Sequence, residues 1–324
     1  MNIRQLRYIS MVAKNGLNMS TTAEKLYTSQ PGVSKQIKQL EDELGVQIFE
    51  RRGRQITRVT AAGEAVIEQA DRVLIEIESL RRAAREFSDP GSGDISMAMT
   101  HTVARYAFPP IVQAFSQRYP RVKIHFHLAT PSQIADQVSK GTVNFGIATE
   151  VMTYFEDLIS LPCYRWRRAV LVPAGHPLSQ ENPLTLAALA RYPLATYTFG
   201  FDPGAPLDTA FRSEGLSPEV SFTATDADVI KTYIRLGHGV GIVAALAYDK
   251  TLDTDLHCMD ASHLFEVSTA HIVFRRGSFI RQHMYDFLNI FAPHLTEEVI
   301  RTAQSPKGKA NLAALLENTE LPLY

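Results

Sequence analysis

Residues 23–41 read Ala-Glu-Lys-Leu-Tyr-Thr-Ser-Gln-Pro-Gly-Val-Ser-Lys-Gln-Ile-Lys-Gln-Leu-Glu, which is two short helical patterns joined by a turn. Ser29 is a suitable N-cap for the second helix, and Pro31 falls in its first turn. Four apolar residues recur at helical spacing and are expected to face a small core: Val33, Ile37, Leu40 and Leu44. The pattern predicts a helix-turn-helix.

The outer face of the second helix carries residue types that contact duplex DNA. The major groove admits one helix, whose N-terminal half touches base edges while hydroxyl and cationic side chains fix the phosphates. We predict DNA contacts from the start of this helix by Ser29, Gln30, Pro31, Ser34, Lys35 and Lys38. An ordinary amphipathic surface helix fits the pattern equally well on its own, so the flanking sequence has to decide.

Residues 49–60 predict a hairpin with Gly53 at its tip and four arginines around it, namely Arg51, Arg52, Arg54 and Arg58. A basic hairpin beside a recognition helix is a wing, and we expect its first three arginines to contact DNA. Residues 1–60 contain ten basic and five acidic residues, a net charge of +5, whereas the whole chain carries −1. A solvated charged loop would leave this concentration of charge unexplained, so the DNA-binding interpretation is preferred.

Residues 61–88 run without proline and predict a long linker helix after the domain at 1–60. Its apolar residues alternate in steps of four and three, as in a coiled coil: Val66, Ala70, Val73, Ile77, Leu80, Ala84 and Phe87. The stripe could pack on the chain's own domains, but pairing with a second copy would present two recognition helices to a dyad-related site. We therefore predict a dimerisation seam of Val66, Val73, Ile77 and Leu80, with a hinge at 89–93.

From residue 94 to residue 302, strands and helices alternate, which predicts parallel α/β sheets. The pattern divides into two lobes, the first at about 94–162 and 268–292 and the second at about 163–267, with a tail at 303–324. Two α/β lobes joined by crossing segments enclose a cleft, and ligands favour the carboxyl ends of such strands.

The predicted cleft residues follow from that rule. Thr100, His101 and Thr102 lie just past the first strand, where hydroxyls and free helix N–H groups could bind an anion or carboxylate, and Thr149 follows another strand. Residues 197–202 leave a strand of the opposite lobe, while residues 225–228 open a helix. For any single threonine a helix cap or a turn is the simpler explanation, and only their joint placement favours a ligand.

Composition excludes several classes of protein. A chain of 324 residues with ordinary apolar and charged fractions predicts a soluble protein of more than one domain. We expect a cytoplasmic protein, because no export signal or membrane span is recognisable. Cys163 and Cys258 are far apart in sequence without metal-ligand spacing, so reduced thiols and no metal site are expected.

Two other functions are weighed against DNA binding. A periplasmic-type solute-binding protein would fit the α/β half alone, but not the basic N-terminal domain. An enzyme could use His101, Asp226 and Asp228 as an acid-base group, yet no nucleophile elbow, phosphate loop or metal cluster accompanies them. Helix capping explains these residues more simply, and we predict no enzymatic activity.

Together these motifs resemble the LysR-type transcriptional regulators, and within them the CysB-like subgroup that regulates sulfur assimilation. The resemblance rests on residues 27–36, 40–45, 100–102, 134–136, 147–150, 161–164, 222–233 and 285–287, and it covers nearly the whole chain. It implies an α-helical winged helix-turn-helix DNA-binding domain and a linker helix, followed by a two-lobed α/β effector domain like a periplasmic binding protein.

The resemblance also implies partners and a ligand. Promoter DNA, further copies of the chain in a homodimer or homotetramer, and RNA polymerase are the expected partners, with no membrane. No enzymatic cofactor is expected, and the co-inducer would be sulfate or an acetylserine-like molecule. The regulated genes would serve cysteine biosynthesis or the use of sulfate or sulfonates; the alternative is another regulon, such as a redox or general metabolic regulon, with a non-sulfate ligand.

Two positions depart from the subgroup and bear on the ligand. Relatives usually have glutamine after Thr102 and threonine after Phe201, whereas this chain has Val103 and Asp202. The resemblance therefore implies ligand contacts from Phe201 and from these two positions, but with fewer neutral donors. A carboxylate would also repel sulfate. Asp202 would then either favour a ligand with an ammonium or hydroxyl group, or point away from the cleft.

Overall fold

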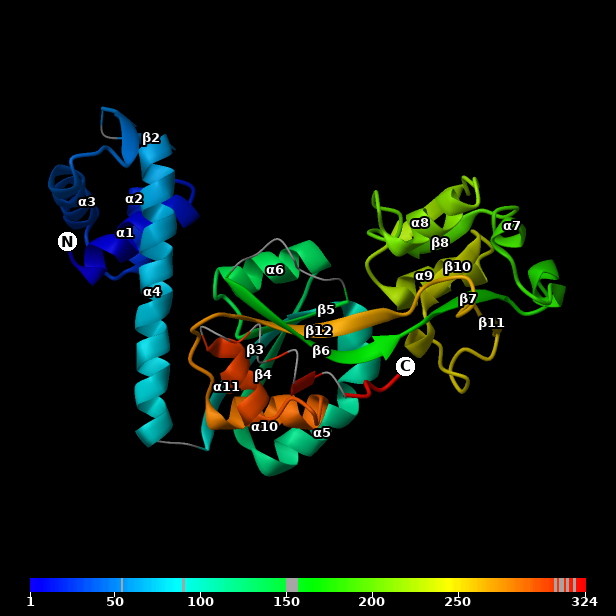
Figure 1. Cartoon of the computed structure of the whole chain (residues 1–324). Helices are drawn as coiled ribbons and strands as arrows, with labels where there is room; N and C mark the ends of the chain where they lie inside the picture. The colour runs from blue at the N-terminus through cyan, green and yellow to red at the C-terminus, as the bar shows by residue number, and fades with distance from the viewer. Residues whose placement is uncertain are drawn as a thin grey trace. The chain divides into compact units, whose positions relative to one another are not determined.

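The computed structural model describes residues 1–53, 55–88, 91–149, 157–305, 308, 312, 315–316 and 319–324, without the side chains of residues 82 and 85–88. Arg54, residues 89–90 of the predicted hinge and part of the predicted tail lie outside the described residues. The chain divides into two compact units, Met1–Ser88 and Asp89–Tyr324, which are considered separately (Figure 1).

The first unit is a helical head with a hairpin and one long helix. Its elements are α1 (Ile3–Lys14), α2 (Met19–Lys25), α3 (Gln30–Leu44), β1 (Phe49–Arg52), β2 (Gln55–Val59) and α4 (Ala61–Ser88). β1 and β2 pair antiparallel, and Gly53 at the turn has φ 66°, a left-handed conformation that glycine adopts without strain. The predicted winged helix-turn-helix is present.

Local sequence explains where α3 begins and ends. The Ser29 hydroxyl accepts a hydrogen bond from the Gly32 N–H at 3.3 Å, and Gly45 ends the helix with φ 69°. Val33, Ile37 and Leu40 are fully buried in the head's core. Leu44 was expected to join them, but it is 38% exposed because it occupies the last residue of the helix, beyond that core.

The first half of α4 packs on the head. Val66 and Ala70 join the core that α1, α2 and α3 share, and Lys14 of α1 pairs with Asp71 at 2.9 Å. Farther along, Val73 is 45% exposed and Leu80 is 73% exposed. The predicted seam is therefore divided, since its beginning serves the head's own core, whereas Val73 and Leu80 are exposed and Ile77 is half-buried.

The first lobe of the second unit has, among the described residues, a five-stranded sheet in the order β4-β3-β5-β12-β6. Its strands are β3 (Ser92–Met99), β4 (Arg121–Leu128), β5 (Phe145–Ala148), β6 (Leu158–Trp166) and β12 (Ser268–Arg275). Its helices are the one-turn π-helix η1 (Val103–Ala107), α5 (Pro109–Arg118), α6 (Pro131–Ser139), α10 (Gln282–Phe291) and α11 (Glu297–Gln304). α6 covers one face of the sheet, and α5, α10 and α11 cover the other (Figure 1).

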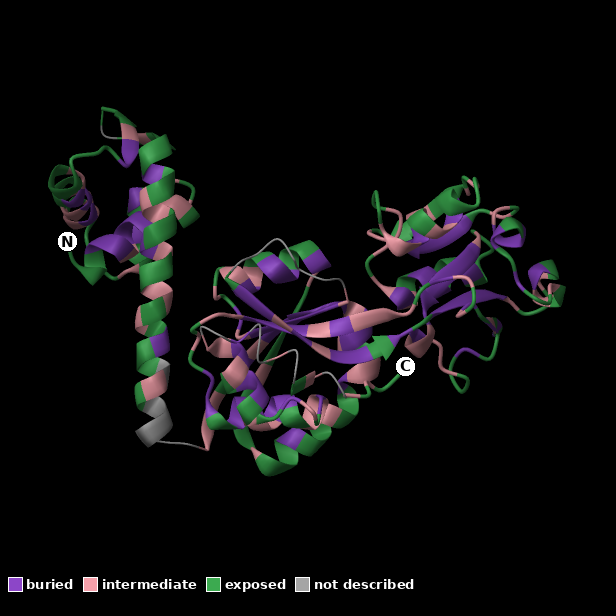
Figure 2. Ribbon diagram, in the orientation of Figure 1, coloured by how far each residue is buried: buried purple, intermediate pink, exposed green. Residues whose placement is uncertain are grey.

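The second lobe has, over the same described part of the chain, a sheet in the order β11-β7-β10-β8-β9. Its strands are β7 (Arg168–Pro173), β8 (Leu194–Tyr197), β9 (Val220–Ala224), β10 (Val240–Ala244) and β11 (Leu256–Asp260). Its helical segments are η2 (Pro177–Gln180), α7 (Leu186–Leu189), α8 (Pro206–Ser213), α9 (Ala227–Arg235) and η3 (Ala245–Ala247). α8 packs on one face and α9 on the other, and Figure 2 shows the buried strands between them.

The sheets differ from the prediction in two respects. They are mixed rather than parallel, because β12 runs antiparallel to β5 and β6, and β7 runs antiparallel to β10 and β11. The first lobe also extends to residue 166 rather than 162, because β6 keeps its pairing with β12 as far as Trp166. None of the described helices combines the length and apolar character needed to cross a membrane.

Candidate nucleic-acid interface and small-molecule pocket

The exposed face of α3 carries two lysines. Lys35 and Lys38 are exposed, and neither forms an ion pair with any residue that the structure describes. Gln30 and Ser34 are half-buried on the same helix, and Ser29 and Pro31 are exposed at its start. An N-terminal helix half with free lysines, an amide and hydroxyls can contact phosphates and base edges together.

The arginines of the hairpin have different surroundings. Arg51 donates to the Ser34 hydroxyl at 3.2 Å and to Glu41 Oε2 at 3.2 Å, so it joins the hairpin to α3. Glu41 in turn accepts from the Ile48 and Phe49 N–H groups at 3.0 Å. Arg51 is thus oriented beside α3 by a carboxylate that is itself fixed.

The other arginines extend the basic face. Arg58 forms a two-point ion pair with Glu50, its direct partner across the hairpin, at 2.7 and 2.6 Å. Arg52 is exposed and has no ion-pair partner within the described part of the chain. Arg54 lies outside the described residues. Among the described arginines of the hairpin, Arg52 is therefore the one whose charge is free for a phosphate.

In the second unit, a cavity of about 20 Å³ lies where the two lobes meet. It is lined by Thr100, Thr102, Val103, Thr149, Tyr164, Trp166, Tyr197, Phe199, Thr225, Ala244 and Leu246. None of these described lining residues carries a charge. A cavity of this size holds about one water molecule, so a larger ligand requires the lobes or the side chains to move.

Two buried polar groups of this lining have no hydrogen-bond partner among the described residues. The hydroxyl of Tyr164 and the indole N–H of Trp166 form no hydrogen bond with any described residue, although the two side chains are only 2% and 6% exposed. A buried polar group without a partner costs about 1–3 kcal/mol. A ligand with acceptor oxygens would supply the missing bonds, so these two atoms are the clearest sign of a binding site here.

A hydrogen bond between hydroxyls joins the lobes across the cavity. Thr102 Oγ1 of the first lobe lies 3.2 Å from Tyr197 Oη of the second, and that oxygen also accepts from the Ala244 N–H at 3.3 Å. Burial raises the pKa of Tyr197, so the phenol stays neutral and can donate to Thr102. The pair closes one side of the pocket.

Charged groups beside the cavity also join the lobes. His101 Nδ1 lies 3.0 Å from Asp226 Oδ1, and Arg105 Nε lies 2.7 Å from Asp228 Oδ2. The hydroxyl of Tyr106 donates to Asp228 and accepts from Lys231 Nζ at 2.9 Å. The start of α9 is therefore attached to η1 and to the residues just before it.

This group does not form a favourable metal site. Ligand atoms of His101, Asp226 and Asp228 lie within 4.8 Å of one another. Asp228, however, already pairs with Arg105 and with Lys231 at 3.1 Å, and these positive charges oppose a further cation. Asp226 caps α9 through the Asp228 N–H, as the sequence indicated.

Both units match known protein families. Residues 3–64 match the bacterial regulatory helix-turn-helix protein of the lysR family, and residues 88–296 match the LysR substrate binding domain. The HTH-type transcriptional regulator CysB of Haemophilus influenzae is 47% identical over 321 residues, which cover 99% of each chain. The chain belongs to the LysR family of transcriptional regulators.

Two further proteins are similar to this LysR-family regulator. The HTH-type transcriptional regulator SsuR of Burkholderia cenocepacia is 46% identical over 300 residues, 93% of this chain and 97% of that one. The crystal structure of the cofactor-binding domain of the Cbl transcriptional regulator matches with a TM-score of 0.62 and 36% identity, covering 66% of this chain and 94% of that one. The predicted family, the fold class and a regulator rather than an enzyme are confirmed.

The LysR-family fold brings part of the predicted ligand set together. Thr100, Thr102, Val103 and Thr149 line the cavity. His101 lies outside the lining and faces Asp226.

Two predicted ligand residues of the second lobe lie elsewhere. Phe201 packs against the core of that lobe, with its ring 5.9 Å from that of Phe211. Asp202 is exposed and is not part of the lining, so no carboxylate of a described residue faces the cavity in this arrangement of the lobes.

Tyr164 and Trp166 were missed as site residues. They lie near the end of β6, at Leu158–Trp166. The first segment of the predicted first lobe ends at about residue 162, so these two residues fall beyond it and were not assigned to the cleft. The one tryptophan of the sequence, close to a lobe boundary, was the available signal. The thiol of Cys163 between them is buried, which raises its pKa and keeps it protonated.

Proposed function

We propose that this regulator binds promoter DNA through α3 and the β1–β2 hairpin, and that a small effector in the cavity between the lobes controls it. The observation that carries the effector proposal is the pair of buried, unpartnered groups on Tyr164 and Trp166. Free lysines on α3 support the DNA proposal. The resemblance to CysB-like regulators supports genes of sulfur metabolism as the targets.

The chemistry of the lining defines the proposed effector. Threonine hydroxyls, a phenol and an indole N–H are neutral donors, which suit the oxygens of a sulfur oxyanion or of an ester such as acetylserine. Val103, Phe199 and Leu246 add apolar walls. We therefore propose an effector in which acceptor oxygens are joined to an apolar part, and place acetylserine-like molecules before free sulfate.

The further partners are proposed on the same basis. The uncovered part of α4 supports pairing of two copies, and a homotetramer would be a pair of such dimers. RNA polymerase at the regulated promoters and a cytoplasmic location belong to the proposal, as expected for a transcriptional activator of this family.

A map of genomic binding sites, made with and without cysteine limitation, tests the regulatory part. Sites upstream of genes for cysteine synthesis and for sulfate or sulfonate use, with occupancy that changes on limitation, are expected. Occupancy confined to unrelated operons, such as redox genes, would reject the sulfur assignment and favour the alternative regulon.

Calorimetric titration of the full-length protein tests the effector. O-acetylserine and sodium sulfate are compared, with emission of Trp166 as a second signal, because this residue lines the cavity and is the sole tryptophan. We expect tighter binding of O-acetylserine, and Val103→Gln should strengthen sulfate binding by adding an amide donor. Tighter sulfate binding by the unaltered protein would contradict the preference.

A further inference from the structure

Residues 322–324 lie against the edge of β6, where Leu323 and Arg165 form a single parallel β-bridge. The Arg165 N–H donates to the Pro322 carbonyl at 2.8 Å, and the Tyr324 N–H donates to the Arg165 carbonyl at 2.9 Å. The Arg167 N–H donates to the Tyr324 carbonyl at 3.0 Å. β6 is the last strand of its sheet, so this segment satisfies backbone groups that a sheet edge leaves open.

The segment docks where the chain passes from one lobe to the other. Arg167 stands between the end of β6 and the start of β7, and Figure 1 marks the end of the chain beside this crossing. The carbonyl of Arg167 also accepts from the Ala245 N–H at 2.8 Å. Ala244 and Leu246, on either side of Ala245, line the cavity. The backbone of Arg167 is thus hydrogen-bonded to the segment through its N–H and to the cavity wall through its carbonyl.

Tyr324 also contacts the cavity wall through its ring. The rings of Tyr324 and Tyr164 lie 5.1 Å apart at 88°, and the ring of Phe291 lies 6.0 Å from Tyr164 at 89°. Edge-to-face pairs of this kind contribute about 0.5–1.5 kcal/mol each. Tyr164, whose hydroxyl lacks a partner in the cavity, is therefore held between an aromatic ring of the first lobe and the ring of Tyr324.

We propose that residues 322–324 are a positioning element for effector binding, which braces the lobe crossing at residues 165–167 and orients Tyr164. A rotation of the lobes must change backbone angles near residue 167, and the docked segment restrains those angles through its hydrogen bonds. Docking of the segment and closure on an effector then favour each other. The inference rests on the proposed role of the cavity as the effector site.

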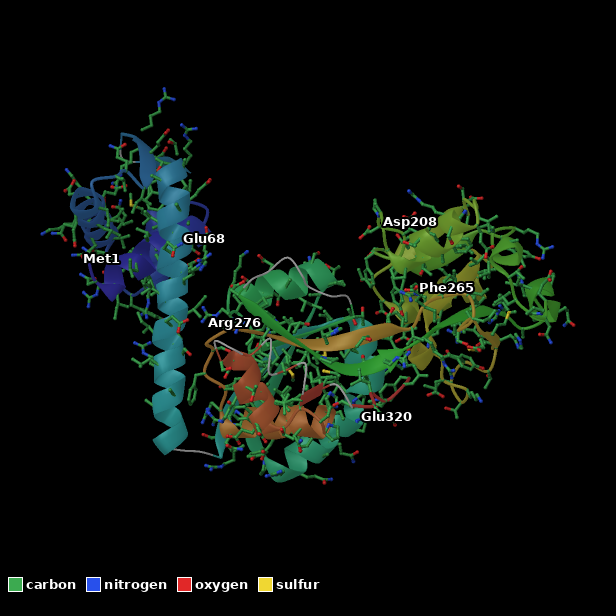
Figure 3. All side chains as sticks on the ribbon, viewed as in Figure 1. Met1, Glu68, Asp208, Phe265, Arg276 and Glu320 are labelled. Carbon is green, nitrogen blue, oxygen red and sulfur yellow. The ribbon has the colours of Figure 1, made fainter. Side chains whose placement is uncertain are left out.

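The test compares three variants of the full-length protein. One lacks residues 322–324, one is Tyr324→Ala, and the control is Leu323→Ala, which removes an apolar side chain that is 51% exposed. Glu320, labelled in Figure 3, lies before the deletion and stays in every variant. O-acetylserine is the probe in calorimetric titration. The deletion and Tyr324→Ala are expected to bind it about five- to tenfold more weakly than wild type and Leu323→Ala.

A second readout does not depend on an effector. Without probe, the deletion and Tyr324→Ala should increase quenching of Trp166 fluorescence by acrylamide and speed hydrogen exchange in the peptide containing Ala245. If hydrogen exchange, acrylamide quenching and O-acetylserine affinity are all unchanged in both variants, residues 322–324 are not a positioning element. If wild type binds no O-acetylserine, that effector assignment fails. Hydrogen exchange and acrylamide quenching still test whether residues 322–324 restrain the lobe crossing. Tyr324→Ala keeps the backbone bonds and so remains informative should the deletion unfold the protein.

Discussion

Lys231 Nζ lies 2.9 Å from Asp253 Oδ2, with the two side chains only 5% and 3% exposed. The ammonium also donates to the Ala247 carbonyl at 3.0 Å and to the Tyr106 hydroxyl. Burial by itself would lower the pKa of Lys231, but its hydrogen bonds to Tyr106, Asp253 and Asp228 outweigh burial and raise it. This one cation therefore ties α9 to the loop before β11 and, through Tyr106, to the first lobe.

Lys231→Met should lower the free energy of unfolding of the effector unit by about 3 kcal/mol, because it leaves the Asp253 carboxylate buried without its main partner. Urea unfolding of the full-length protein, followed by Trp166 fluorescence, measures the change. In the double variant Lys231→Met/Asp253→Leu much of the loss should be recovered, since no buried charge remains unpaired. Equal stability of Lys231→Met and wild type would show that Arg235, 2.7 Å from Asp253, compensates fully.

The link between the lobes should weaken in acid. Burial opposes the charge of Asp228, yet hydrogen bonds from Tyr106 and Lys231 hold the pKa of its carboxyl below the ordinary 3.8. A depressed carboxyl pKa contributes stability above the unfolded pKa, and this stability is lost as the pH falls through the folded pKa. The pKa of Lys231 is raised in the folded protein. Its charge therefore contributes stability that is present at neutral pH and is lost only at strongly alkaline pH.

Asp228→Asn should therefore lose less thermal stability than wild type when the pH falls from 6 to 3. Melting temperatures of the full-length protein across this range provide the measurement. Asp136→Asn is the control. Asp136 is 54% exposed and forms an i,i+4 ion pair with Lys140, and a surface pair of this kind contributes little to stability. A pH profile of Asp228→Asn that parallels the wild-type profile would remove Asp228 from the acid response.

The sequence predicted elements whose causes are local. A hydroxyl at Ser29, a proline in the next turn and apolar residues at steps of three and four define α3 without reference to the rest of the chain. Thr100, Thr102 and Thr149 were placed correctly near one another, because each follows a strand whose carboxyl end meets the same edge of the sheet.

Pairing between distant segments could not be predicted in this way. Tyr164 and Trp166 reach the cavity only because β6 stays with β12 to the lobe crossing, and that register depends on residues a hundred positions away. Phe201 was assigned to the cleft from its place after β8, yet its partly buried ring packs against the core beside Phe211. The ion pair between Arg58 and Glu50 follows from the register of the hairpin, but from the sequence Arg58 was counted only among the basic residues.

Lys35→Ala should weaken binding to all DNA sequences and reduce the salt dependence. An exposed lysine that neutralises one phosphate contributes about 0.9 to the slope of log K against log salt concentration. Fluorescence anisotropy with promoter and random duplexes over a series of salt concentrations measures both effects. Lys250→Ala is the control. Lys250 is an exposed lysine of the second unit, so this variant should leave the slope unchanged. An unaltered slope for Lys35→Ala would exclude a phosphate contact.

Gln30→Ala should instead reduce the preference for the promoter over random DNA. An amide at the start of a recognition helix can read a base edge, and loss of such a contact typically costs about 1–3 kcal/mol on the correct sequence. Competition binding between the two duplexes gives the specificity ratio. Equal losses on promoter and random DNA would mean that Gln30 contacts only the backbone.

Leu80→Glu should weaken the proposed pairing of two copies and shift the protein towards monomer. Val73 and Leu80 lie seven residues apart on α4 and are largely exposed in one copy, so they form the part of the seam that the head's own core does not use. A buried, unpaired carboxylate at a pairing face opposes association. Sedimentation velocity at micromolar concentration measures the change. Glu68→Gln serves as the control, since Glu68, labelled in Figure 3, pairs with Arg72 on the exposed surface of the same helix. If Leu80→Glu sediments as the wild-type oligomer does, the copies associate through another surface, and the two recognition helices are not held together by α4.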